Sequence, residues 1–145
     1  MATLRQILAQ KGPRVFSIAP GSTVLEAAQL MNGHRIGSLA VVENGQLVGI
    51  FTERDILMRI VARQLDPTAT KVHEVMTREV VCGGPHTTVE EARGVMKNRR
   101  LRHLPILDEV GQLCGMVSIG DLNAYETHDK EMTIHLLQEY ISGPT

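Results

Sequence analysis

The spacing of apolar residues along the chain predicts amphipathic helices alternating with short strands. One set shares a single helical face: Val24, Ala27, Ala28 and Met31. Short apolar runs typical of strands lie at residues 15–18, 38–42 and 47–51. Asn44-Gly45, between the last two runs, is a strong hairpin signal. With a second helix expected over residues 53–62, the first half of the chain has the order β-α-β-β-α.

The same order returns in the second half. A shift of 65 residues superimposes identical residues: Pro20 on Pro85, Thr23 on Thr88, Val24 on Val89, Glu26 on Glu91, Ala27 on Ala92 and Met31 on Met96. After one inserted residue in the hairpin turn, a shift of 66 places Asp55 on Asp121. Strands are therefore expected at residues 80–82, 104–107 and 113–117, and a final helix over residues 119–125. Such agreement at a fixed register indicates an internal duplication.

The first helix of each copy has a clear start signal. Thr23 precedes Glu26, and Thr88 precedes Glu91, in the Thr-x-x-Glu pattern of a capping box. One such unit covers only one face of its small sheet, so a single copy would be marginally stable. We therefore expect the copies to pack against each other around a pseudo-two-fold axis, which creates clefts suited to a ligand.

These elements divide the chain into five segments. They are an N-terminal helical segment (1–12), the first repeat (13–65), a linker (66–77), the second repeat (78–126) and a C-terminal helix (127–145). The fold class is α+β. We also expect a homodimer, with the apolar helical faces of both copies at its interface.

Composition argues against several other classes of protein. Apolar residues make up 43% of the chain, charged residues 21%, and the formal net charge is −1. With two Phe, two Tyr and no Trp, the chain has few aromatic side chains on which nucleic-acid bases could stack. Residues 1–11 lack a signal-peptide core, and no run of about 18 apolar residues predicts a membrane span. We therefore expect a cytoplasmic protein with no membrane or nucleic-acid partner.

Catalytic and metal-binding patterns are also missing from the sequence. Cys82 and Cys114 form no CxxC pair, and the six His residues form no i, i+4 pair, so no metal ligand set is expected. The sequence contains no P-loop, nucleophile elbow or dinucleotide-binding glycine fingerprint. We do not expect an enzyme.

Each copy places a hydroxyl and a carboxylate at the start of its second helix. Thr52 precedes Asp55 by three residues, and Ser118 precedes Asp121 by the same interval. One interpretation is a helix N-cap, in which the side chains satisfy free backbone N–H groups. The other is ligand binding, and the two roles are compatible.

A family resemblance adds weight to the ligand-binding interpretation. The pattern Gly-x-x-Thr/Ser-x-x-Asp follows a hairpin twice, Met76-Thr77 opens the second copy, and an Arg-His-Leu-Pro-Ile motif (102–106) precedes its hairpin. Over about residues 13 to 125 the chain resembles a tandem cystathionine-β-synthase (CBS) domain pair, the Bateman module. The resemblance implies two β-α-β-β-α CBS repeats and an adenine-nucleotide ligand.

The resemblance also implies roles for particular residues. Asp55 and Asp121 would accept hydrogen bonds from the ribose hydroxyls. Thr52 and Ser118 would supply a hydroxyl and nearby backbone amides to the phosphate. The same helix starts include Arg54 and Ile119. Apolar walls for adenine would come from Ile18, Ile36 and Ala40 in one cleft, and from Val81, Leu101 and Pro105 in the other.

A basic cluster makes the two clefts unequal. Arg99, Arg100, Arg102 and His103 are either phosphate contacts or a solvated turn. Arg102-His103 aligns with Gly37-Ser38, and Arg54 with Gly120. We therefore expect the Arg102-His103 cleft to hold the more phosphorylated ligand end, and the Gly37-Ser38 cleft to be less charged.

The expected function is that of a sensor module whose nucleotide occupancy is signalled to a separate, unknown protein target. The expected ligand is an adenine nucleotide (AMP, ADP, ATP or NAD), with AMP or ATP first, NAD as a further candidate and S-adenosylmethionine below them. The alternative is a structural dimerisation module without physiological nucleotide sensing.

Overall fold

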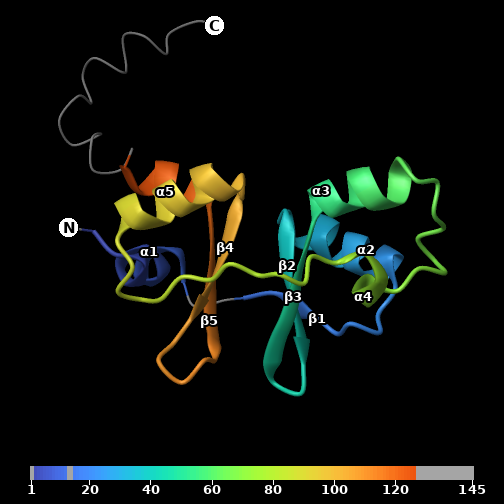
Figure 1. Cartoon of the computed structure of the whole chain (residues 1–145), viewed down its shortest axis with the longest axis horizontal. Coiled ribbons are helices and arrows are strands. Elements are labelled where there is room, and N and C mark those ends of the chain that lie inside the picture. Colours follow the sequence, from blue (N-terminus) through green and yellow to red (C-terminus); the bar gives the residue numbers. More distant parts are fainter. Residues whose placement is uncertain (1, 13–14, 127–145) are drawn as a thin grey trace, which may run out of the picture.

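The computed structural model describes residues 2–12 and 15–126, and the expected C-terminal helix at 127–145 lies outside them. The described chain forms two α+β repeats whose sheets lie next to each other between two groups of helices (Figure 1). Within the described residues, no helix has the length and apolar character needed to cross a bilayer.

The first repeat follows the expected order. Its elements are β1 (Ser17–Ile18), α2 (Val24–His34), β2 (Ser38–Glu43), β3 (Gln46–Thr52), α3 (Glu53–Asp55) and the π-helical segment η1 (Ile56–Val61). The sheet order is β1-β2-β3, with β1 parallel and β3 antiparallel to β2. Asn44 and Gly45 both adopt positive φ in the β2–β3 turn, as this hairpin type requires.

The second repeat lacks one expected strand. It contains α5 (Val89–Arg99), β4 (His103–Leu107), β5 (Leu113–Ser118) and a helix over residues 119–126. The prediction of a strand at residues 80–82 was wrong, since the chain there pairs with β4 only through a parallel bridge between Gly83 and Ile106. Gly83-Gly84-Pro85 follows directly, and glycine and proline are poor strand residues.

Both predicted capping boxes are present. The Thr23 Oγ1 accepts a hydrogen bond from the Glu26 N–H at 3.1 Å, and the Glu26 carboxylate accepts one from the Thr23 N–H at 3.2 Å. The Thr88–Glu91 pair makes the same two bonds, each 3.1 Å long. Four otherwise unpaired N–H groups at the starts of α2 and α5 are thereby satisfied.

Each repeat is completed by a helix that precedes the other repeat. The helix α1 (Leu4–Lys11) packs on the second repeat, where the Leu4 N–H donates to the Thr87 carbonyl at 2.9 Å. The helix α4 (Val72–Val75) packs on the first, where the Val72 N–H donates to the Ser22 carbonyl at 2.8 Å. This reciprocal exchange ties the repeats together and obeys the pseudo-two-fold symmetry.

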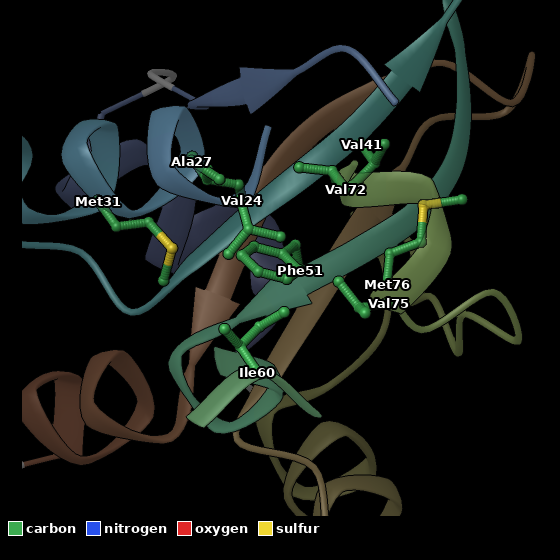
Figure 2. Close-up of a cluster of buried hydrophobic side chains, with 10 residues drawn as sticks. Val24, Ala27, Met31, Val41, Phe51, Ile60, Val72, Val75 and Met76 are labelled. Carbon is green, nitrogen blue, oxygen red and sulfur yellow. The ribbon is translucent and has the colours of Figure 1, made fainter. Parts of the chain in front are cut away.

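Three apolar clusters hold the fold together. In the first, Phe51 of β3 lies between Val24 of α2 and Ile60 of η1, with Val75 and Met76 beside it (Figure 2). The second is the equivalent core of the other repeat and includes Leu4 and Ile7 of α1. The third, centred on Ala40, Ile50 and Met116, joins strands of the two sheets.

These clusters correct the predicted dimer interface. Val24, Ala27 and Met31 of α2 are buried inside the first repeat, as are Val89, Ala92 and Met96 of α5 inside the second. The apolar faces of both helices therefore pack on their own sheets and are unavailable to a second copy.

Candidate functional site

A cleft opens where the two repeats meet, and it contains two adjoining hollows. The larger has a volume of about 540 Å³ and the smaller about 260 Å³. Both are lined by Arg35, Ile36, Gly37, His103 and Ser118. The larger falls within the range of about 300–1,000 Å³ that is usual for small-molecule sites.

The end of α2 shapes one wall of this cleft. Arg35 adopts the left-handed conformation (φ 54°, ψ 46°), and the Ile36 N–H donates to the Met31 carbonyl at 3.0 Å, which ends the helix sharply. The Gly37 carbonyl then accepts a hydrogen bond from the Glu53 N–H at 3.1 Å. These bonds hold residues 35–37 against the start of α3.

Gly37 permits the two repeats to approach closely. A Cβ atom at this position would lie 3.0 Å from Glu53 Oε1 and 3.3 Å from His103 Nε2. Both distances are shorter than ordinary van der Waals contacts, so a larger residue would push His103 away from the first repeat. The sequence-based expectation of separate Gly37-Ser38 and Arg102-His103 clefts was therefore wrong, because Gly37 and His103 line the same hollows.

The start of the helix over residues 119–126 forms the opposite wall. The Ser118 Oγ accepts from the Asp121 N–H at 3.0 Å, and Asp121 Oδ2 accepts from the Ser118 N–H at 2.8 Å. Ser118 lines both hollows, Asp121 the smaller and Ile119 the larger. The predicted capping arrangement thus leaves its hydroxyl and carboxylate at the surface of the cleft.

Both hollows carry more cationic than acidic side chains. Asp121 in the smaller hollow pairs with Lys11, whose Nζ lies 2.7 Å from Oδ2. Arg35 lines both hollows, and the larger one adds Arg102 and the carboxylate of Glu53. Cationic side chains thus outnumber carboxylates two to one in each hollow, so either hollow could hold an anion.

His103 lies between these charges. Burial lowers the pKa of its imidazole, and Lys11 and Arg102 act in the same direction, whereas Glu53 and Asp121 oppose them. The folded protein therefore favours the neutral imidazole, which gains a proton more readily when an anion enters the cleft.

Asp55 has a different environment from its counterpart Asp121. The residue is 7% exposed and lines neither hollow. It accepts from the Thr52 N–H at 3.0 Å and from the Thr77 hydroxyl at 3.5 Å, and Arg59 Nε lies 3.7 Å from Oδ1. Segment 76–77, Arg59 and the capping bonds thus surround this carboxylate, and its ligand-binding role stays a prediction.

Most of the residues predicted to contact adenine lie elsewhere. Ile36 lines both hollows, and Ser38 lines the smaller one. The other predicted apolar walls pack in the clusters or are fully buried: Ile18, Ala40, Val81, Leu101 and Pro105. Arg54 donates to Met58 Sδ at 3.3 Å, and Arg100 ends α5 in the left-handed conformation, so neither lines these hollows.

Other residues of the smaller hollow were missed by the sequence analysis. Val15, Phe16 and Met116 supply its apolar wall, and the Phe16 ring stacks on His34 with centroids 4.1 Å apart. Lys11 was also missed, although a shift of 68 residues aligns Leu4, Ile7 and Leu8 with Val72, Val75 and Met76. This 68-residue shift would have shown that α1 and α4 are equivalent, and therefore that α1, with Lys11 at its end, packs on a repeat.

Metal binding has no support from the described part of the chain. Within residues 2–12 and 15–126, no three His, Cys, Asp or Glu side chains gather in a group that could hold an ion. The chemistry of the cleft is instead a carboxylate at a helix start, an apolar wall and a group of cationic side chains.

Two α+β repeats that share a polar cleft define a tandem-repeat module. The model of the CBS domain family matches the chain twice, at residues 6–62 and 72–127. The chain therefore belongs to the CBS domain family, as a tandem pair.

Relatives of known sequence or structure agree. The chain is 42% identical over 109 residues to the CBS domain-containing protein YhcV of Bacillus subtilis, covering 75% of this chain and 76% of YhcV. A putative signal-transduction protein with CBS domains from Burkholderia ambifaria has a similar structure, with a TM-score of 0.86 and 36% identity, covering 92% of this chain and 99% of that one. The CBS domain pair of MJ0100, in complex with 5′-methylthioadenosine and S-adenosyl-L-methionine, shares the fold with a TM-score of 0.79 at 23% identity, covering 90% of this chain and 99% of that one.

Proposed function

We propose that this chain is a regulatory module that binds an adenine nucleotide in the cleft between its CBS repeats and signals occupancy to a separate protein. The carrying observation is that Asp121, at a helix start, lines a hollow whose apolar wall includes Phe16 and Ile36. A carboxylate can accept two hydrogen bonds from the vicinal hydroxyls of a ribose, while the apolar wall suits a purine.

The neighbouring charges favour a phosphorylated ligand. Arg35 and Arg102 line the larger hollow, next to the Asp121 hollow, so a nucleoside in the smaller space could extend its phosphates toward them. AMP or ATP therefore leads our proposal, NAD follows, and S-adenosylmethionine ranks below them. MJ0100 was solved with two adenosine-containing ligands, which supports the adenosine moiety as the shared part.

Signalling would follow from the position of the cleft. Because Gly37 comes from the first repeat and Ser118 from the second, a ligand contacts both. It can shift the arrangement of the repeats by the difference in its affinity for the two arrangements. We propose a binding module rather than an enzyme, and we keep the cytoplasmic location that the sequence predicts.

A homodimer remains part of the proposal, on a new surface. Leu57, Met58 and Val61 of η1 are 62%, 52% and 62% exposed. Neighbouring apolar side chains on one short helical segment are unusual on a monomer surface and favour contact with another copy.

One observation favours the alternative, a structural dimerisation module that does not sense nucleotides. Asp121 already has a cationic partner within the chain, Lys11, so its carboxylate does not need a ligand to be satisfied.

A thermal melting panel of AMP, ATP, NAD, S-adenosylmethionine and GTP separates the two functions. A specific ligand at about 100 times its Kd adds about 2.7 kcal/mol of stability. Our proposal expects at least one adenine compound to raise the melting temperature and GTP to leave it unchanged. No shift with any adenine compound would favour the structural module.

A further inference from the structure

Lys11 is the last residue of α1, and its ammonium reaches into the smaller hollow. Its Nζ donates to the Met116 carbonyl at 2.6 Å and to Asp121 Oδ2 at 2.7 Å. Leu4 and Ile7, both buried, and Leu8, which packs over Gly115, anchor α1 on the second repeat. The backbone of Lys11 is thus held in place while its side chain can move.

Lys11 and a ribose would compete for the same carboxylate. Asp121 Oδ2 already accepts from both the Ser118 N–H and Lys11, so a bound diol meets an acceptor that the ammonium has partly neutralised. The Lys11 and Asp121 side chains are 35% and 25% exposed, and an ion pair at such a position is weak enough to exchange partners.

A phosphate changes this competition. An ammonium carries three N–H donors, of which the Met116 carbonyl and Asp121 take two. With the ribose at Asp121 and the phosphate toward Arg35, which lines the same hollow as Lys11, the phosphate offers Lys11 a more strongly charged acceptor. The four-carbon side chain of Lys11 is flexible enough to reach it. Lys11 would then release Asp121 to the ribose.

We infer that Lys11 makes the cleft selective for phosphorylated adenine compounds over the free nucleoside, by moving from Asp121 to the ligand phosphate. The inference rests on the proposed function and adds a specificity-determining residue to it. It also links the phosphate of the ligand to α1, because Lys11, the last residue of α1, would have different partners with and without the ligand.

The test compares AMP with adenosine by isothermal titration calorimetry, in wild type and in Lys11→Met. We expect the ratio of AMP affinity to adenosine affinity to fall about tenfold or more in Lys11→Met, because one charge-assisted hydrogen bond to phosphate is lost while the diol loses a competitor. Lys11→Arg, which keeps the cation, should restore most of the ratio. Lys97→Met, at an exposed position in the last turn of α5, serves as the control and should keep the wild-type ratio.

The possible outcomes separate this inference from the proposed function. If wild type binds neither AMP nor adenosine, the proposed function fails and the inference with it. If wild type binds AMP but Lys11→Met keeps the wild-type ratio, the role of Lys11 alone is overturned. If Lys11→Met fails to fold, Lys11→Arg becomes the test. A Lys11→Arg variant that loses the wild-type ratio of AMP affinity to adenosine affinity would also overturn the inference.

Discussion

Asp55 and Asp121 occupy equivalent positions in the two repeats, and each accepts a hydrogen bond from the N–H of the residue three positions earlier, at 3.0 and 2.8 Å. Asp121 lines the smaller hollow of the cleft, whereas Asp55 is surrounded by Thr77 and Arg59. The duplicated sequence has thus produced one carboxylate that lines the cleft and pairs with Lys11, and one that is buried between Thr77 and Arg59.

This difference predicts unequal effects of the same substitution. Asp121→Ala should lower AMP affinity about tenfold or more, because a charged acceptor for the ribose is lost. Neither hollow gives support to the predicted ribose contact of Asp55, so Asp55→Ala should leave AMP affinity within about threefold. It should instead lower the free energy of unfolding by about 1–3 kcal/mol, since buried donors lose their acceptor. Calorimetric titration and urea denaturation of both variants provide the comparison. Equal losses of AMP affinity would show that the cleft at Asp121 has been wrongly chosen.

Because α1 and α4 pack on opposite repeats, adding a methyl group at Gly49 and at Gly115 should have different effects on stability. A Cβ at Gly49 would lie 2.6 Å from Met76 Sδ and 2.9 Å from the Thr77 carbonyl oxygen. Gly49→Ala should therefore destabilise the fold by about 1–3 kcal/mol. Gly115→Ala should cost less, because the nearest atom, at 2.5 Å, is the Cδ2 end of the flexible Leu8 side chain.

Gly94 supplies the matched control. It lies inside α5, and a Cβ there would meet nothing within 4 Å. Gly94→Ala should stabilise the protein by about 0.5–1 kcal/mol through higher helix propensity. Urea denaturation measures all three variants. A Gly49→Ala variant as stable as wild type would show that Met76 and Thr77, which follow α4, do not pack tightly on β3.

Much of this fold could be predicted from local sequence signals. The capping boxes at Thr23 and Thr88 and the Asn44-Gly45 turn act within a few residues, so their consequences appear directly in the sequence. The partner of α1 could not be predicted in this way, since apolar spacing shows that a face is buried but not against which repeat. Lys11 was missed for that reason.

The candidate site was predicted less completely than the fold. Ser118 and Asp121 were found from their spacing, but the closeness of Gly37 and His103 depends on how the two repeats pack. The burial of Asp55 has the same origin, because Thr77 comes from the segment after α4. Duplication predicts equivalent positions and not equivalent surroundings.

Stability should depend on pH through His103. Burial lowers the pKa of this imidazole, so near neutral pH and below, the unfolded chain binds more protons than the folded one. Stability should fall as the pH drops below about 6.5, the ordinary histidine value, and the loss should level off below the lowered folded-state pKa. His103→Gln should flatten the profile of melting temperature between about pH 7 and pH 5. An unchanged profile in the variant would mean that His103 is not held neutral.

The exposed side chains of η1 predict where copies of the chain meet. Val61 is 62% exposed in the single chain. Val61→Glu should shift the protein toward monomer, because a charge would then lie where an apolar side chain is proposed to contact the second copy. Val110→Glu, at an 80% exposed position in the β4–β5 turn, should leave the association unchanged. Sedimentation velocity of the three proteins at micromolar concentration gives the answer. A monomeric wild type would refute the dimer, and equal effects of both substitutions would refute this interface.

The most direct measurement is a crystal structure of the protein grown with saturating AMP. Adenosine should lie between Gly37 and Ser118, with both ribose hydroxyls within hydrogen-bonding distance of the Asp121 carboxylate and the phosphate toward Arg35 and Arg102. An empty cleft under saturating AMP, or AMP bound away from Asp121, would contradict the proposal that this pair of repeats senses an adenine nucleotide.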